Sequence, residues 1–527
     1  MKPRVTRRST AFRQSIVSVL SSIGDEQAIS QIVDIEAGLP PLGVHATKGS
    51  ESTLGEGGSE DEDLNVVGWD GDDDPEHPYN MPRWRINITG GLLAFLAFIT
   101  PLGSAILAPA SRQVLAEFNS TSELLEAFVV SVYVLGLAFG PLIWAPLSEI
   151  YGRLYVYHGT NLCFIALTVA CAKSTSLEML IAFRFFAGFF GSCVLANGGG
   201  TFSDMLRQED RGIFMALFVL GPIMGPVIGP VGGGFLSTAK GWRWVFWLVA
   251  ILSGATAVLL IIFTRETYAP VILKRKLARL QRETGNANLH LKNQDELTPW
   301  SILRHNIVRP LKLTLFSPVC IITSLMMAVI YGILNLLFTS ISQEYQAVYG
   351  FAPNISGLAF LGLGIGCFFG IISVGVGSEL YSVHQVRKTG GERKPEYRIF
   401  LMPVSALLVP AGLFIYGWTA EKHVHWIVPI IGEGVTGLGI MSMFMSIILY
   451  TIDSFALYAA SALAANGLIR SIAGGLLPLA GLTMYTNLGV GWGNSVLAFI
   501  SLALFPVALL LLRYGEHLRI TYQVKNL

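Results

Sequence analysis

Apolar residues along the chain are gathered into twelve blocks, each long enough to form a helix that crosses a membrane. A helix rises about 1.5 Å per residue, so about 20 apolar residues span a hydrocarbon layer about 30 Å thick. The blocks cover residues 88–110, 125–147, 155–173, 177–199, 213–236, 244–264, 315–339, 355–377, 399–419, 425–450, 456–481 and 488–512. This pattern predicts an all-α membrane protein with twelve transmembrane helices.

The polar segment after the sixth block is much longer than the other connections. Six blocks on either side of a polar loop are the sequence form of two parallel membrane repeats. We therefore expect two six-helix pseudo-repeats, an N-terminal half and a C-terminal half, with a cytoplasmic loop between them and a short cytoplasmic tail. The expected boundaries are 84–264 for the first half, 265–314 for the loop, 315–514 for the second half and 515–527 for the tail.

The basic residues in the connections are unevenly divided between the two sides of the membrane. Twenty-two Lys and Arg residues fall on the side of the N-terminus, and five fall on the other side. Cytoplasmic loops carry the excess of basic residues, so both termini are predicted in the cytoplasm. We expect the plasma membrane as the location, with the vacuolar membrane as the alternative.

Composition excludes an ordinary soluble enzyme. Charged residues make up 13% of the 527 residues and hydrophobic residues 52%, whereas soluble domains carry about 25% charged residues. The net charge of +1 conceals a division, because residues 1–83 hold 7 basic and 15 acidic residues. This segment has few large apolar groups from Gly55 to Pro78, which predicts a disordered acidic cytoplasmic tail over residues 1–83. A regulatory or trafficking segment with phosphorylation sites is the alternative.

A short motif at the end of the second block fits a gate between two helices. Glu149 and Arg153 lie four residues apart, so they can form an ion pair, and Gly152 permits a tight turn. We interpret the motif as a charge latch, and a topological anchor is the alternative. The motif resembles the signature loop of the major facilitator superfamily, G-x-x-x-D-x-x-G-R-[KR], from which Ala145 and Leu154 depart.

Arg184 lies inside the fourth block, among phenylalanines. A charge near the bilayer centre costs about 2.5–3.5 kcal/mol even on insertion scales, so such a residue normally faces a partner or an internal cavity. The alternative is an arginine near the end of the span whose side chain reaches the interface. In the superfamily an R-x-x-x-G pattern is linked to proton coupling, and the resemblance implies this role for Arg184, four residues before Gly188.

The fifth block carries the most specific pattern. Glycine recurs every four residues, and a proline follows three of these glycines: Gly221, Pro222, Gly225, Pro226, Gly229, Pro230 and Gly233. Such glycines allow close helix approach, and the prolines allow bending. We expect this face to slide or bend against the eighth block, where Gly362, Gly366 and Gly370 have the same spacing. The pattern resembles the antiporter signature of exporters in the superfamily, G-x-x-x-G-P-x-x-G-G, which implies export.

Glu433 is the second candidate for proton coupling. It lies within the tenth block between Gly432 and Gly434, and a buried carboxyl group can exchange protons near neutral pH. It could equally be the site of a cationic substrate, a structural partner of Arg470, or an interfacial residue near the outer end of its helix.

A broad-specificity cavity is apolar with isolated polar groups. The candidates for substrate binding are Asn197 in the fourth block, Tyr331 and Asn335 in the seventh, and Asn466 in the eleventh. The aromatic residues of the seventh block could stack on planar or cationic ligands. Each candidate has an alternative role as a packing or hydrogen-bonding residue between helices.

Several further features limit the function. No phosphate-binding glycine loop, metal-ligand spacing or catalytic cluster occurs, so we expect no cofactor, no metal, no nucleic acid and no enzyme activity. Asn119 begins a glycosylation sequon in the first outer loop. The basic run from Lys274 in the central loop has an amphipathic pattern, which predicts a helix lying on anionic headgroups.

Segments over about residues 84–520 resemble the fungal twelve-span drug:proton antiporters, among them Trp242–Trp247, Glu266–Pro270 and Tyr450–Asp453. The resemblance implies a monomeric exporter of drug-like compounds or secondary metabolites that exchanges them for protons by alternating access. The alternatives are a polyamine or other nutrient or cation carrier, and a membrane sensor that does not transport.

Overall fold

A computed structural model of the chain describes residues 65–71, 73–207, 210–291, 299–390, 393–455 and 458–522. These residues belong to one compact unit, Leu64–Leu527. The predicted tail therefore lies outside the described residues up to residue 64, and so do residues 523–527 at the other end.

Long helices build the N-terminal half. They are α3 (Arg83–Ala105), α5 (Glu123–Tyr151), α6 (Arg153–Ala172), α7 (Leu177–Met205), α8 (Arg211–Lys240) and α9 (Arg243–Phe263). The 3-10 turn η2 (Ala108–Ala110) and the short helix α4 (Ser111–Glu117) connect α3 to α5. The polar loop that follows contains α10 (Ala269–Thr284) and α11 (Pro299–Phe316).

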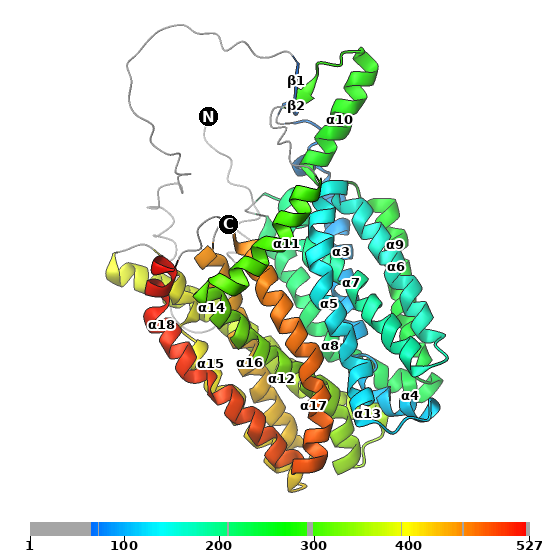
Figure 1. The fold of residues 1–527 in the computed structure, drawn as a ribbon, viewed down its shortest axis with the longest axis vertical. Coiled ribbons are helices and arrows are strands. Elements are labelled where there is room, and N and C mark those ends of the chain that lie inside the picture. Colours follow the sequence, from blue (N-terminus) through cyan, green and yellow to red (C-terminus); the bar gives the residue numbers. More distant parts are fainter. Residues whose placement is uncertain are drawn as a thin grey trace. The chain divides into compact units, whose positions relative to one another are not determined.

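The C-terminal half is also helical. Its elements are α12 (Pro318–Val348), α13 (Pro353–Ser356), η3 (Gly357–Ala359), α14 (Phe360–Thr389), η4 (Pro395–Ile399), α15 (Met402–Glu421), α16 (Ile427–Phe455), α17 (Ala459–Leu502) and α18 (Leu504–Thr521). In Figure 1 this half, coloured from green to red, lies beside the blue-to-cyan helices of the first half.

The described residues contain eleven helical stretches that are long and apolar enough to cross a membrane. The last stretch, Ala459–Thr521, is 63 residues long. Gly489 interrupts it with φ 79° and ψ 166°, where two helices are joined across a kink. In Figure 1 the orange and red parts of this stretch form two columns that meet at the end away from α10. The last stretch therefore supplies the eleventh and twelfth crossings, and the predicted all-α membrane fold is confirmed.

Serine and glycine set several helix ends. Ser122, Ser176 and Ser317 each accept a hydrogen bond from the backbone N–H three residues later, at the starts of α5, α7 and α12. These hydroxyls satisfy N–H groups that have no partner within the helix. Gly152 follows α5 with φ 99°, a conformation that favours glycine.

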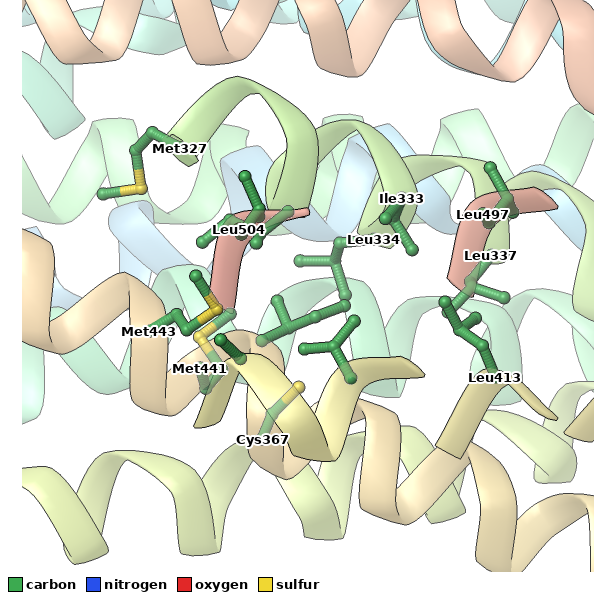
Figure 2. Packing of buried hydrophobic residues seen from close by; sticks show 14 of the residues in the cluster. Met327, Ile333, Leu334, Leu337, Cys367, Leu413, Met441, Met443, Leu497 and Leu504 are labelled. Carbon is green, nitrogen blue, oxygen red and sulfur yellow. The ribbon is translucent and has the colours of Figure 1, made fainter. Parts of the chain in front are cut away.

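Each half has its own main hydrophobic core, and Ile223 of α8 also packs into the core of the second half. The large core of the C-terminal half contains Leu337, Cys367 and Met443, which come from three different helices (Figure 2). The N-terminal half has two smaller clusters, one around Ile99 and one around Leu93. Because each half buries its own apolar residues, each can behave as a packed unit.

The halves meet mainly in two places. In one, α5 packs against α17, and in the other, α8 packs against α13 and α14. We name the end of the helices that carries α10 and α11 the loop end, and the other end the opposite end (Figure 1). At the opposite end, the hydroxyl of Thr486 donates to the carboxylate of Glu123 over 3.3 Å. Nearer the middle, a Cβ on Gly475 would lie 2.4 Å from Leu135, so α17 and α5 are in close contact.

The structure differs from the sequence prediction at residues 65–80, which we name the acidic strap. The strap was expected to be unfolded, yet its β1 (Val66–Val67) pairs in parallel with β2 (His290–Leu291) after α10. Lys276 of α10 is 2.8 Å from Asp70 and 3.0 Å from Asp74. Lys276 is thus buried against acidic side chains rather than directed to lipid headgroups.

Candidate functional site: two gates and a central pair of ionisable groups

The tight turn between α5 and α6 is stabilised by the carboxylate of Glu266, which lies in the stretch after α9. Glu266 accepts hydrogen bonds from the backbone N–H of Arg153 over 2.9 Å and of Leu154 over 3.3 Å. These N–H groups begin α6, where a negative charge is favourable. A Cβ on Gly152 would lie 2.3 Å from the Glu266 carboxylate, so a glycine is required here.

The predicted ion pair between Glu149 and Arg153 is replaced by other contacts. The Nε of Arg153 lies 3.2 Å from Asp204 at the end of α7, and its Nη1 donates to the Ser148 hydroxyl over 2.7 Å. Glu149 instead accepts from Asn306 of α11 over 3.2 Å. Asp204 lies on the neighbouring helix α7, from which its carboxylate reaches the Arg153 guanidinium. Glu149 is left to contact the segment that leads into the second half.

Asn197 belongs to this same cluster at the loop end. Its Oδ1 accepts from the Ser148 hydroxyl over 2.9 Å and from Arg153 over 3.3 Å. Its Nδ2 donates to the Trp144 carbonyl over 3.3 Å. Asn197 is 1% exposed, so in this conformation it stabilises the contact between α5 and α7.

The glycine face of α8 lies against α3, not against α14 as predicted. Cβ atoms on Gly221, Gly225 and Gly233 would lie 2.9, 2.7 and 2.0 Å from backbone atoms of Phe98 and Ile106. Likewise, the glycines of α14 face α16, because a Cβ on Gly366 would lie 1.9 Å from the carbonyl oxygen of Gly434. Glycine spacing indicates close approach but does not identify the partner helix, and here each partner lies within the same half.

A different set of residues joins α8 to the second half. A Cβ on Gly234 would lie 2.5 Å from the Pro353 carbonyl oxygen, and one on Gly357 would lie 2.4 Å from that of Pro230. A Cβ on Gly364 would lie 2.2 Å from Val227. Pro230 therefore does lie at a contact between the halves, on the neighbouring side of α8.

A buried polar network at the opposite end also joins the halves. The amide of Gln343 in α12 donates to the Glu126 carboxylate in α5 over 2.7 Å and to the Ser111 hydroxyl over 3.2 Å. Ser111 in turn donates to Glu126 over 3.0 Å. We name Ser111, Glu126 and Gln343 the opposite-end network. The sequence interpretation missed it, although a carboxylate one residue inside the second apolar block was a visible signal.

Arg184 is held by backbone carbonyl groups of two other helices. Its Nη atoms donate to the carbonyls of Gly103 over 3.3 Å, Ser104 over 2.9 Å and Val130 over 3.1 Å. Gly103 and Ser104 are in the last turn of α3, where carbonyls lack partners within the helix. The guanidinium also lies over the ring of Tyr133, at 5.4 Å from its centroid. Arg184 is 1% exposed and fastens α3, α5 and α7 together.

Glu433 lies fully buried in α16 of the second half, whereas Arg184 lies in α7 of the first half. Neither carboxyl oxygen makes a hydrogen bond of good geometry within the described part of the chain. The Tyr345 hydroxyl is the polar group that interacts with it. No ion pair joins Glu433 to Arg470 among the described residues, so that alternative does not fit this conformation.

Tyr331 and Asn335 lie together beside Arg470. The Arg470 guanidinium lies over the Tyr331 ring at 5.1 Å and over the Phe444 ring at 5.2 Å. Asn335 donates to the Tyr331 carbonyl over 2.9 Å. Asn466 is elsewhere, bound to Ser324 and donating to Thr451 over 3.2 Å. The four predicted substrate residues are therefore divided among three places.

The cysteines are free, four of them buried and Cys163 exposed. No group of His, Cys, Asp or Glu that could hold a metal ion occurs within the described ranges. Asn119 is exposed between α4 and α5 with φ 52°, and its glycosylation stays a prediction.

Twelve membrane crossings in two helical halves that pack against each other define a two-repeat helical membrane protein. The family model of the Major Facilitator Superfamily matches residues 93–478. The chain therefore belongs to the major facilitator superfamily and is a multi-pass membrane transporter.

Fungal relatives are similar over almost the whole chain. The MFS-type transporter tndD of Aspergillus flavipes is 48% identical, covering 86% of this chain and 85% of its own. The MFS-type transporter penM of Penicillium rubens is 48% identical over 88% and 92%. The efflux pump radE of Floropilus chiversii is 43% identical over 94% and 93%.

Solved structures share the fold at low sequence identity. A D-xylose–proton symporter has a TM-score of 0.61 at 13% identity, covering 81% of this chain and 97% of its own. An inward-facing bacterial homologue of the human lysosomal transporter Spinster has a TM-score of 0.62 at 13% identity, covering 85% and 100%.

Proposed function

We propose that the protein exports small organic molecules, of the secondary-metabolite or drug-like kind, in exchange for protons by alternating access. The relatives include one named as an efflux pump, which supports the direction of transport. The glycine–proline face of α8, which resembles the antiporter signature, supports it as well. The observation that carries the proposal is the opposite-end network, because a buried polar contact between two rigid halves is a gate.

The two ends of the helices would form two gates. With the loop end in the cytoplasm, the opposite-end network and the contact of Pro230 with Gly357 close the outer side. Substrate would then enter from the cytoplasm. The outward step would break these contacts and bring the halves together at the loop end, around Glu149, Gly152 and Arg153.

The prolines of α8 would serve this step. Pro222, Pro226 and Pro230 each remove a hydrogen bond from the helix. The glycine face keeps α8 joined to α3, so the two helices would bend as a pair while the opposite side of α8 slides along α13 and α14.

Glu433 would carry the exchanged proton. It is fully buried without an ion-pair partner in the described residues, and a buried carboxylate without a partner is costly. Proton release would therefore require the outward conformation to bring water to Glu433. Arg184 would act with it by holding α3, α5 and α7 in register, as a positioning residue.

Tyr331 and Asn335 would contact the substrate, since Tyr331 is half-buried beside α17 and the buried Asn335 adjoins it. Asn197 and Asn466 would act on the substrate path only in another conformation, because both are engaged within their own halves here. A polyamine carrier would need a carboxylate beside Tyr331, where the structure has Arg470.

The proposed state is a monomer in the plasma membrane with both termini in the cytoplasm.

The test is expression in an efflux-deficient yeast, screened against toxic compounds, organic acids and spermidine with and without a protonophore. We expect resistance to a set of organic compounds that the protonophore abolishes. Inside-out vesicles should take up the same compounds when their lumen is acidic. Resistance unaffected by the protonophore would overturn proton exchange, and uptake only in right-side-out vesicles would overturn export.

A further inference from the structure

Arg470 is a cation near the middle of the membrane with no counter-charge in the described residues. It lies 11 residues after Ala459, the first residue of α17, which is about 16 Å along the helix. This is about half the thickness of a 30 Å hydrocarbon layer. A charge at this depth normally has a partner or lines a water-filled cavity.

No protein group neutralises Arg470 within the described part of the chain. Its guanidinium lies over the ring of Tyr331 in α12 and over the adjoining ring of Phe444 in α16. Its Nε is buried and makes no hydrogen bond, and no ion pair involves it among these residues. Arginine has five N–H donors, and aromatic faces attract the cation without accepting them as a carboxylate does.

The face of α17 that carries Arg470 is open on one side of this residue and packed on the other. A Cβ on Gly467, one turn before Arg470 on the same face of α17, would have no heavy atom within 4 Å. One turn after it, a Cβ on Gly474 would lie 2.7 Å from the Tyr331 ring and 2.9 Å from Nδ2 of Asn335. The next residue, Gly475, contacts Leu135 of the first half. Arg470 therefore lies between an open position and a packed one, close to the contact between the halves.

The surrounding charges favour an anion. No Asp or Glu occurs within two helical turns of Tyr331, of Phe444 or of Arg470 along their own helices. A polycation placed here would meet an unneutralised guanidinium and no carboxylate. A carboxylate, phenolate or enolate would accept its N–H groups, which are strong hydrogen bonds when both partners are charged.

We propose that Arg470, with Tyr331 and Asn335, binds the anionic group of a conjugated organic acid. The guanidinium pairs with the anion, the Asn335 amide donates to it, and the Tyr331 ring lies along the conjugated system. The proposal rests on the export function above and names its substrate class. It makes organic acids the cargo and excludes polyamines.

Binding of matched acid and amide probes tests this site apart from export. Purified protein in nanodiscs is titrated with radiolabelled salicylate, with neutral salicylamide and with spermidine. We expect salicylate to bind at least tenfold more tightly than salicylamide. Arg470→Gln should remove that tenfold preference, and Arg470→Lys should retain part of it.

Arg513→Gln is the matched control, because Arg513 is exposed at the loop end and also lies over a tyrosine ring, that of Tyr514. It should leave the preference unchanged. Each variant is also checked for an unaltered melting temperature, so that loss of folding is recognised; if Arg470→Gln does not fold, the comparison is made with Asn335→Leu, which should weaken salicylate binding about threefold or more.

Equal binding of salicylate and salicylamide, or a preference for spermidine, would overturn the proposal. An unchanged salicylate preference in Arg470→Gln would overturn it as well. The outcome for export is separate. If the protein binds salicylate through Arg470 but confers no resistance in yeast, the proposed function is contradicted and the anion site is still supported.

Discussion

The two halves treat their membrane-embedded charges in opposite ways. In the first half, Arg184 donates to three backbone carbonyls and Arg153 pairs with Asp204. In the second half, Glu433 has no hydrogen bond of good geometry among the described residues, and Arg470 has only aromatic rings. A charged group that is hydrogen-bonded to neighbouring helices stabilises their packing. A charged group without such partners can still form its bonds with a proton or a ligand. We therefore assign a structural role to the charges of the first half, and the proposed proton and ligand binding to those of the second half.

The largest expected effect comes from Arg184→Ala. It would leave buried carbonyls of α3 and α5 without donors, and each such group costs about 1–3 kcal/mol. We expect a loss of at least about 3 kcal/mol in stability, together with loss of coupled export. Thermal unfolding followed by size-exclusion chromatography measures the first effect, with exposed Arg513→Ala as the control. Wild-type melting and wild-type efflux in Arg184→Ala would contradict the structural role.

A smaller effect is expected at the contact between the halves. Gln343→Ala removes the hydrogen-bond donor to Glu126 and Ser111. We expect this to destabilise the joined conformation by about 1–2 kcal/mol relative to the separated one. Distance measurements between labels at Asn119→Cys and Lys422→Cys, on the two halves at the opposite end, should then show a larger open population when the exposed Cys163 is replaced by Ser. Gln385→Ala, away from this network, should leave the distances unchanged. Identical distance distributions in both variants would show that the network is not a gate.

Glu433→Gln tests the chemical role of the second half with almost no change in shape. We expect folding to persist and the pH dependence of transport in proteoliposomes to become flat between about pH 5 and 8, because the amide cannot exchange a proton. Glu178→Gln, at an exposed position in the first turn of α7, is the matched control. A wild-type pH profile in Glu433→Gln would remove this residue from the mechanism.

The smallest effect is expected in the acidic strap. Burial opposes the charge of Asp74, but the N–H groups of Asp70 and Glu76 and the ammonium of Lys276 outweigh it and lower the pKa of Asp74 to about 2. Because the pKa of Asp74 in the folded chain is below its ordinary value of 3.8, the stabilisation by its charge is complete above pH 3.8 and is lost as the pH falls through about 2.

Hydrogen exchange of residues 65–80 measures this release. We expect protection to be constant down to about pH 4 and to fall as the pH approaches about 2. Asp74→Asn should lower the protection already at neutral pH, whereas Asp73→Asn is the neighbouring control. Protection that is the same in both variants would show that the ion pair does not hold the strap.

The sequence predicted the helices well because a hydrocarbon layer demands long apolar blocks, whatever their partners are. It also placed the turn at Gly152 correctly, since a positive φ between two helices favours glycine. Partner choice could not be predicted. The spacing of Gly221 and Gly225 requires a close helix but does not distinguish α3 from α14, and the Arg153 partner, Asp204, lies 51 residues away. Local composition likewise suggested disorder at Asp74, because its partner Lys276 lies 202 residues later in the sequence.

The acidic strap attaches part of the central loop, which connects the two halves, to the first half. By joining the stretch before α3 to α10 and β2, it ties together both chain ends of the first half. In the proposed rocking motion, the part of the central loop from Arg265 to Leu291 would therefore move with the first half. A tag inserted between Thr284 and His290 would accordingly disturb the first half alone.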